Sequence, residues 1–255
     1  MKFYKYQATG NDFVVFDGRG SNIPNHVEFL SKICDRRFGI GADGVIIIQN
    51  SDTYDFKVDY YNPDGTCSLC GNGTRSAIRF AEKLGLVKSH TFFEAFDGPH
   101  EAEILPNNTI KLKMTDVQNV IHFEEGIFID TGSPHLVQFV DDVETVDVYQ
   151  IGRKLRYETP VEKGTNVNFV QIVDKSNLKI RTYERGVEQE TLSCGTGVTA
   201  SALAASLKGL ETHIALQARG GELKVEFDSN GSDKFTNIYL IGPAEEVFEG
   251  VIEID

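Results

Sequence analysis

Alternating hydrophobic and polar residues predict paired β-strands at two places in the chain. The segments FKVDYYN (56–62) and LKIRTYE (178–184) alternate as half-buried strands do. VIIIQ (45–49) precedes the first of them and NFVQIV (168–173) the second, each separated from it by a turn. The same strand pair is therefore expected twice, about 120 residues apart.

An internal repeat follows each strand pair and predicts a helix. Residues 70–86 read CGNGTRSAIRFAEKLGL and residues 194–210 read CGTGVTASALAASLKGL, with six identities in 17 ungapped positions. Each copy is typical of a glycine turn that opens a helix of about three turns, and Gly85 and Gly209 fit the left-handed position that ends one. The second helix, over 198–207, has no polar face, so we expect strands to enclose it on all sides.

The repeat extends upstream of the strands. Gly10-Asn11-Asp12 leads into FVVF, and Gly132-Ser133-Pro134-His135 leads into LVQFV. Gly10 precedes the first helix turn by 60 residues (70 − 10) and Gly132 the second by 62 (194 − 132). We therefore predict an α+β fold of two pseudo-symmetric half-domains, 1–117 and 118–245. Each is a strand-rich shell wrapped around one helix, and the active site lies in the cleft between them.

Composition narrows the possible partners and the compartment. The 255 residues include 25 Lys and Arg against 38 Asp and Glu, a formal net charge of −13. Nucleic acids and anionic membranes require a basic face, so we expect neither as a partner. The longest aliphatic run, 45–48, is far too short to span a membrane, and the N-terminus shows no secretory signal. These features favour the cytoplasm, where thiols stay reduced.

The repeat places a cysteine immediately before each helix. A helix N-terminus carries unpaired N–H groups and about half a positive charge, which stabilise a carboxylate and favour a thiolate. If the two helix ends face each other, Cys70 and Cys194 flank the α-carbon of a bound amino acid. One thiolate then removes the α-proton and the opposite thiol returns one to the other face. This arrangement predicts stereoinversion by two bases.

The motifs CGNGTR (70–75) and ERGVEQETLSCGTG (184–197), with GNDFVV (10–15) and NPDG (62–65), resemble the diaminopimelate epimerase family. The resemblance runs from residue 1 to the C-terminus. It implies an isomerase without pyridoxal phosphate, other cofactor or metal that interconverts LL- and meso-diaminopimelate for lysine and peptidoglycan synthesis. It also implies a homodimer and a last strand, about 246–255, that returns to the first half.

The same resemblance assigns roles to individual residues. Cys70 and Cys194 are the implied catalytic pair, while His135 and Glu184 modulate their protonation. The implied substrate ligands are Asn11, Asn62, Gly71, Asn72, Ser133, Asn166, Glu184, Arg185, Gly195 and Thr196. Arg185 suits a distal carboxylate, because its guanidinium can hold one bidentately.

Two positions depart from the family pattern. Ser133 stands where the family often has asparagine, so one amide ligand becomes a hydroxyl that reaches less far. The segment from Glu184 to Cys194 is one residue longer than the common form, which we expect to bulge the loop without moving its ends.

Other interpretations remain open from the sequence. Ser133 motivates a racemase of another amino acid, such as proline or histidine. Cys67-Ser68-Leu69-Cys70 is a C-x-x-C that suits a thiol-redox centre or half of a metal site, although no second pair of ligands accompanies it. GTGVTA (195–200) fits a dinucleotide-binding turn but lacks the parallel strand series around it. Cys34 and Cys67 are expected to be buried and to take no part in the chemistry.

Overall fold

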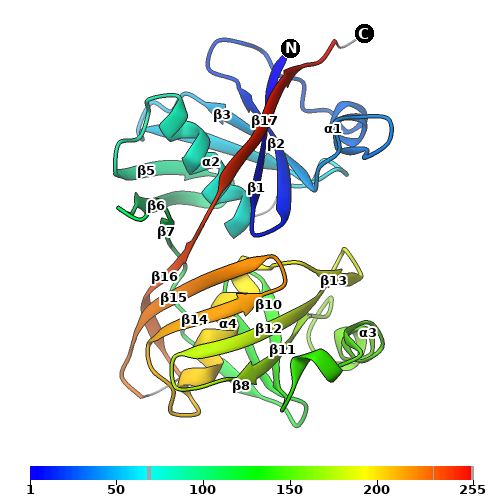
Figure 1. Ribbon diagram of the computed structural model, residues 1–255, viewed down its shortest axis with the longest axis vertical. Coiled ribbons are helices and arrows are strands. Elements are labelled where there is room, and N and C mark those ends of the chain that lie inside the picture. The colour runs from blue at the N-terminus through cyan, green and yellow to red at the C-terminus, as the bar shows by residue number, and fades with distance from the viewer. Residues whose placement is uncertain (68–69, 232, 254–255) are drawn as a thin grey trace. The chain divides into compact units, whose positions relative to one another are not determined.

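The chain forms two compact units (Figure 1). The computed structural model describes residues 1–67, 70–231 and 233–253. Unit 1 comprises Met1–Leu112 together with the chain from Gly242 onward, and unit 2 comprises Lys113–Ile241. Each unit therefore has its own set of strands and helices.

Unit 1 contains two helices and strands that pair in both parallel and antiparallel directions. Its strands are β1 (Lys2–Ala8), β2 (Asn11–Asp17), β3 (Gly44–Gln49), β4 (Phe56–Tyr61), β5 (His90–Ala95), β6 (Gly98–Ile104), β7 (Ile110–Lys113, whose last residue begins unit 2) and β17 (Glu245–Val251). The helices are α1 (Val27–Cys34) and α2 (Gly71–Lys83). β2 runs parallel to β3, β3 antiparallel to β4, β4 parallel to β5 and β5 antiparallel to β6.

Unit 2 repeats this order of pairing. Its strands are β8 (Val120–His122), β9 (Ile127–Asp130), β10 (Pro134–Phe139), β11 (Asn166–Ile172), β12 (Asn177–Glu184), β13 (Gln189–Thr191), β14 (His213–Ala218), β15 (Gly221–Ser229) and β16 (Phe235–Gly242). The helices are α3 (Val148–Glu158) and α4 (Gly195–Ser206), with a short 3₁₀ turn, η1 (Val143–Thr145), before α3. β10 runs parallel to β11, β11 antiparallel to β12, β12 parallel to β14 and β14 antiparallel to β15.

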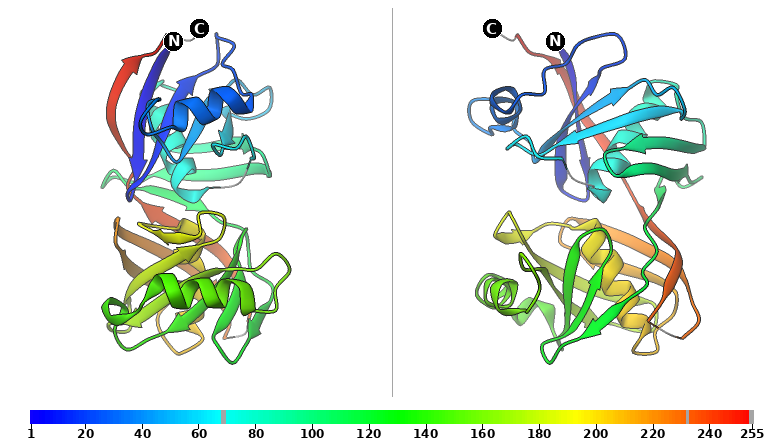
Figure 2. Two further views of the ribbon diagram at one scale, coloured as in Figure 1. Left: turned by 90° about the vertical axis from the view of Figure 1, so that its right-hand side faces the viewer. Right: turned by 180° about the vertical axis from the view of Figure 1, so that it is seen from behind.

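The two helices after the glycine turns are the central elements of their units. Residues 195–205 of α4 are all buried, against strands that include β10, β11 and β15. Figure 2 shows α4 running among the strands of unit 2 while α3 lies outside them. In unit 1, α2 packs against β1, β2 and β3. The predicted α+β class, with a strand-rich shell around one helix in each half, is confirmed.

Glycines permit the turns that begin and end these elements. Thr9 and Gly10 join β1 to β2 with φ of 49° and 85°, the left-handed pair of a two-residue hairpin turn. Gly85 follows the last residues of α2 with φ of 75°, and Gly209 follows α4 with φ of 88°. Asn11 and Asp12 are the first two residues of strand β2.

The last strand, β17, pairs antiparallel with β1 over Lys2–Gln7. Residues 254–255 of the predicted last strand lie outside the described residues. Within the described part of the chain, no helix combines the length and apolar character needed to cross a membrane.

Candidate active site

Cys70 occupies the N-cap of α2, where the chain turns from extended backbone into the helix. Its φ and ψ are −121° and 106°, and its half-buried Sγ accepts a hydrogen bond from the Gly73 backbone N–H at 3.4 Å. Gly71 and Asn72, both buried, form the first turn. The first-turn N–H groups and the positive end of the helix dipole are therefore next to this sulfur.

Asn11 lies beside Cys70, and its amide is held in one orientation. Its Oδ1 lies 3.6 Å from Sγ of Cys70 and accepts from Nδ2 of Asn72 at 3.2 Å. Its Nδ2 donates to the Asp43 carboxylate at 2.6 Å. A carboxylate only accepts, so Asp43 directs the amide nitrogen away from Cys70 and the carbonyl oxygen toward it.

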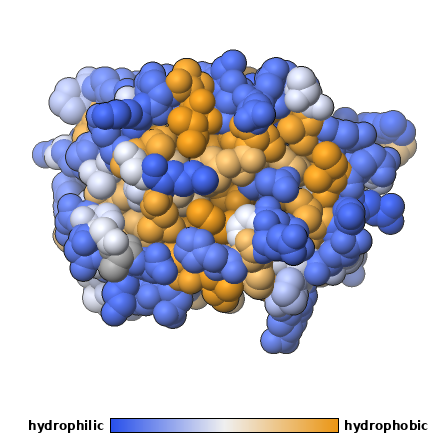
Figure 3. Space-filling view, turned by 90° about the horizontal axis from the view of Figure 1, so that it is seen from below, coloured by the Kyte–Doolittle hydropathy of each residue, from blue (hydrophilic) through white to orange (hydrophobic). Residues whose placement is uncertain are grey.

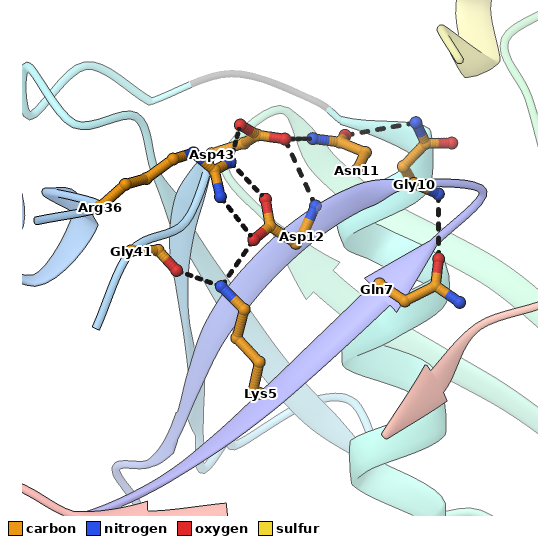
Figure 4. A network of polar contacts seen from close by, with 9 residues as sticks. Lys5, Gln7, Gly10, Asn11, Asp12, Arg36, Gly41 and Asp43 are labelled. Carbon is orange, nitrogen blue, oxygen red and sulfur yellow. Dashed lines mark hydrogen bonds and ion pairs between the residues drawn. The ribbon is translucent and has the colours of Figure 1, made fainter. Parts of the chain in front are cut away.

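Asp43 belongs to a network of charged side chains behind Asn11. Arg36 bridges the carboxylates of Asp12 and Asp43 at 2.7 Å each, and Lys5 contacts Asp12 at 2.7 Å and the Gly41 carbonyl (Figure 4). Burial disfavours the Asp12 carboxylate, but hydrogen bonds from Arg36 and Lys5 outweigh it and lower its pKa to about 2. These charges compensate one another and form a rigid support for the start of β2.

Asn62 follows β4 in the loop that leads toward Cys70. Its Oδ1 accepts from the Tyr60 hydroxyl at 3.1 Å, and its Nδ2 donates to the carbonyl and hydroxyl oxygens of Thr66. The loop is thus shaped by the Asn62 side chain.

Cys194 occupies the corresponding N-cap of α4, with φ and ψ of −126° and 112°. Gly195 and Thr196, both buried, open the helix. Thr196 Oγ1 lies 3.4 Å from Sγ of Cys194, so a hydroxyl adjoins this sulfur where a carbonyl oxygen adjoins Cys70.

Three polar side chains meet next to Cys194. His135 Nε2 lies 2.9 Å from both the Ser133 and the Thr196 hydroxyl oxygens, which are 3.1 Å from each other. Ser133 precedes β10 and His135 is its second residue, so the start of this strand positions both against the first turn of α4. The serine at 133, one of the two departures in sequence, is therefore engaged with the neighbours of a thiol.

Asn168 determines which nitrogen of His135 carries the proton. Its Nδ2 lies 3.1 Å from His135 Nδ1 and donates to the Leu136 carbonyl, while its Oδ1 accepts from the Thr182 hydroxyl at 3.0 Å. An amide NH₂ cannot accept, so Nδ1 is the acceptor and the neutral ring is protonated at Nε2. Thr196 can then accept from Nε2 and donate its own proton to Cys194.

The His135 ring is fully buried and neutral. Burial lowers the pKa of His135 to about 3, and the positive charge of Arg185 acts in the same direction. The neutral His135 ring is therefore linked to Cys194 through the Thr196 hydroxyl, which lies 2.9 Å from Nε2 and 3.4 Å from Sγ.

Asn166 and Arg185 form a second polar group in unit 2. Asn166 Oδ1 accepts from the Arg185 backbone N–H at 2.8 Å, and its Nδ2 donates to the Pro134 carbonyl at 2.9 Å. Arg185 donates to the Gly164 carbonyl, and half-buried Glu184 is the last residue of β12. Hydrogen bonds thus join β11 to the turn that follows β12.

The structure brings some of the residues proposed from sequence into contact and adds others. Asn11 and Asn72 adjoin Cys70, whereas Ser133, His135 and Thr196 adjoin Cys194. Sequence reasoning missed Asp43, Asn168 and Thr182. Asn168 opens the predicted strand 168–173, and the observed strand β11 begins two residues earlier at Asn166, so the two asparagines face the same side of it.

The expectation that Cys34 and Cys67 are both buried is half right. Cys34 ends α1 in the core of unit 1, where burial raises the pKa of its thiol to about 11. Cys67 is exposed, because it follows the turn after β4 and only bridges to Tyr61 at the edge of that strand. Among the described residues, no group of three or more His, Cys, Asp or Glu side chains is arranged to hold a metal ion.

Comparison with known proteins identifies relatives along the whole chain. The family model for diaminopimelate epimerase matches residues 3–120 and 127–247. A diaminopimelate epimerase of Flavobacterium psychrophilum is 48% identical, covering 99% of this chain and 100% of the relative. One of Aquifex aeolicus is 41% identical, covering 98% and 97%.

Solved structures of more distant proteins share the fold. A phenazine biosynthesis protein of Bacillus anthracis superposes with a TM-score of 0.79 at 16% identity, covering 100% of this chain and 99% of that one. A hydroxyproline epimerase of Agrobacterium vitis, solved with trans-4-hydroxy-L-proline bound, gives 0.70 at 14% identity, covering 98% and 91%. At such identities the likeness concerns the fold alone.

Proposed function

The chain belongs to the diaminopimelate epimerase family, and on that premise we propose that Cys70 and Cys194 carry out its stereoinversion of diaminopimelate. The enzyme is an isomerase of lysine biosynthesis that acts on an amino acid without pyridoxal phosphate. The observation that carries the two-thiol proposal is the repeated N-cap cysteine, with the same extended backbone before the same glycine turn in each unit.

In this mechanism one sulfur enters the reaction as a thiolate and the other as a thiol. The thiolate removes the α-proton, the electron pair is delocalised into the α-carboxylate, and the opposite thiol protonates the other face. The two sulfurs thereby exchange protonation states, and no atom is gained or lost. The backbone N–H groups of Gly71, Asn72, Gly195 and Thr196, in the first turns of α2 and α4, stabilise the carboxylate charge as it grows.

The remaining proposed ligands either orient the reacting groups or bind the second amino acid group of the substrate. Asn11 and Ser133 adjoin the thiols on either side, and His135 modulates Cys194 through the Thr196 hydroxyl. We assign Asn62, Asn166, Glu184 and Arg185 to the distal, unreacting end of the substrate, where Arg185 pairs with its carboxylate.

The racemase alternative is less well supported than diaminopimelate. Its motive was Ser133, but the Ser133 hydroxyl bonds His135 and Thr196. The relatives at 48% and 41% identity are named diaminopimelate epimerases.

Hydrogen exchange at the α-carbon tests the reaction. Incubation with LL-diaminopimelate in D₂O, without pyridoxal phosphate or added metal, is expected to incorporate deuterium and to form the meso isomer. Absence of deuterium at the α-carbon would exclude the two-thiol mechanism.

Single cysteine variants assign the thiols. We expect Cys70→Ala and Cys194→Ala each to lower turnover by about a hundredfold or more, as loss of a positioned acid or base does. Cys67→Ala is the matched control and is expected to retain activity, because its exposed thiol takes no part. Equal loss in Cys67→Ala would favour the C-x-x-C redox interpretation instead.

The proposal includes a homodimer. Figure 3 shows a face on which apolar residues gather at the centre with hydrophilic residues around them, and such patches are typical of protein interfaces. Light scattering coupled to size-exclusion chromatography measures the mass, and twice 28.3 kDa is expected.

A further inference from the structure

Arg75 is a fully buried arginine whose acceptors are all neutral. Its guanidinium donates to Asn72 Oδ1 at 2.8 Å, the Gly71 carbonyl at 3.2 Å, the Pro243 carbonyl at 3.3 Å and Thr9 Oγ1 at 3.4 Å. Its exposed fraction is 0%. Burying a cation without an anionic partner is costly, so its retention in this position requires a reason.

The other charged groups around α2 already compensate one another. Lys5 and Arg36 pair with Asp12, Arg36 with Asp43, Lys57 with Asp59, Arg79 with Glu82, and Lys83 with Glu246 and Glu249, while the Tyr6 hydroxyl donates to Glu246. Arg75 differs from these groups, because none of the four acceptors that its guanidinium has among the described residues is a carboxylate.

The second unit shows that the carbonyl of the first helical residue can be satisfied without a charged side chain. The repeat places Thr199 at the corresponding position, five residues after its N-cap cysteine. The Thr199 hydroxyl donates to the Gly195 carbonyl at 3.0 Å, just as Arg75 donates to the corresponding Gly71 carbonyl. A small neutral residue therefore satisfies the same carbonyl, and Arg75 adds a positive charge together with its bonds to Thr9, Asn72 and Pro243.

We propose that Arg75 is a positioning residue for Cys70. Its uncompensated charge favours the Cys70 thiolate and the binding of the substrate carboxylate at the N-terminus of α2. The same guanidinium holds Asn72 Oδ1, which leaves Asn72 Nδ2 to orient Asn11 beside the sulfur. Burial lowers the pKa of Arg75 to about 10, and attraction to Cys70 opposes this lowering. At neutral pH the guanidinium is still charged.

Thr9 offers a way to neutralise this charge without removing Arg75. It is buried, adjoins the guanidinium and has a φ of 49°, a conformation that aspartate and asparagine tolerate better than threonine. Thr9→Asp places a carboxylate against Arg75, and Thr9→Asn is the matched neutral control of the same shape.

The experiment follows iodoacetamide modification of each cysteine against pH, by mass spectrometry of the full-length protein in reductant. Relative to Thr9→Asn, we expect Thr9→Asp to slow Cys70 alkylation at neutral pH about tenfold, which corresponds to one pKa unit. Cys194 serves as the internal control and is expected to change by less than about twofold. Identical Cys70 profiles in the two variants would overturn the proposal.

A second pair of variants, with replacements at Arg75 itself, is used if circular dichroism shows that Thr9→Asp does not fold. Arg75→Lys keeps the charge and Arg75→Gln removes it, so Cys70 is expected to stay reactive at lower pH only in the lysine variant. Equal profiles in this pair would also overturn the proposal. The inference builds on the proposed function, but alkylation requires no substrate, so its outcome is independent of whether the protein epimerises diaminopimelate.

Discussion

The two thiols occupy equivalent backbone positions but different electrostatic surroundings. Cys70 has a carbonyl oxygen of Asn11 and the buried charge of Arg75 nearby, whereas Cys194 has the Thr196 hydroxyl and the neutral ring of His135. The repeat thus duplicates the backbone of the site without duplicating its charges. A difference between the thiols suits a reaction in which one is deprotonated and the other is not.

The protonation state of the His135 ring can be measured directly by NMR. Because Asn168 donates to Nδ1 and burial lowers the His135 pKa to about 3, we expect the neutral Nε2–H tautomer from pH 9 down to pH 5. Two-dimensional ¹H–¹⁵N spectra of the imidazole nitrogens would show an unprotonated Nδ1 and a protonated Nε2 throughout.

Asn168→Ala provides the comparison for this prediction. Without the amide donor the ring is released from one tautomer, so we expect a mixed signal and slower alkylation of Cys194, with Cys70 unaffected. A protonated Nδ1 in the unsubstituted protein would show that the hydrogen-bond assignment is wrong.

The sequence allowed the residues that carry the proposed chemistry to be chosen, but not the residues that orient them. Cys70 and Cys194 stand out because a helix N-terminus after a cysteine occurs twice. Asp43 and Asn168 are distant in sequence from the atoms they orient, and neither belongs to a motif. The exposure of Cys67 depends on how the loop after β4 lies against that strand, which spacing alone does not determine.

At the scale of elements, the sequence predicted the helices that follow the glycine turns and missed α1 and α3. α1 has only eight residues, and both helices lie in segments without a repeated motif. Their existence follows from topology, since β2 and β3 are parallel, as are β10 and β11, and parallel neighbours need a crossover connection. The alternation of polar and apolar residues predicts strands but not which neighbours run parallel.

Gly152 in α3 tests how this crossover helix packs on β12. A Cβ added at Gly152 would lie 2.5 Å from Cβ of Tyr183, whose side chain is fully buried. Alanine normally stabilises a helix interior relative to glycine by about 1 kcal/mol. Here we expect Gly152→Ala to reduce the free energy of unfolding by about 1–3 kcal/mol. The added methyl group would overpack the site, because the buried Tyr183 side chain cannot move aside without disturbing its own packing.

Urea unfolding measures this effect, with Arg153→Ala as control. Arg153 is exposed on the same helix, so its replacement is expected to change stability little. Stabilisation by Gly152→Ala would mean that α3 does not pack on Tyr183 as described.

At the scale of the whole molecule, the chain is divided unequally between its units. Unit 2 is one continuous stretch, Lys113–Ile241, but unit 1 needs the chain from Gly242 onward to complete it. β17 pairs with β1, Glu246 accepts from Tyr6 and Lys83, and the Pro243 carbonyl accepts from Arg75. The repeat predicted two halves, whereas the returning strand was only implied by family resemblance, because a lone terminal strand carries no repeat signal.

This division predicts that the units differ in their ability to fold alone. A polypeptide of residues 113–241 retains both its helices and its strands except for the last residue of β16, so we expect it to unfold cooperatively in urea. Residues 1–112 lack β17 and leave one edge of β1 without its partner, so we expect a loss of cooperative unfolding.

A permuted polypeptide distinguishes the loss of β17 from a general weakness of unit 1. Val251 pairs with Lys2, and the Met1 carbonyl accepts from the Ile252 N–H, so the end of β17 lies beside the start of β1. Residues 242–255 can therefore be joined to Met1 by a short glycine–serine linker as an antiparallel hairpin, followed by residues 2–112. We expect circular dichroism in urea to show that this permuted chain recovers cooperative unfolding, while the same chain with residues 242–255 scrambled does not. If residues 1–112 alone unfold at the same urea concentration as the permuted chain, β17 is not part of the folding unit. Its backbone pairing with β1 and the bonds of its segment to Tyr6, Lys83 and Arg75 would then contribute nothing to stability.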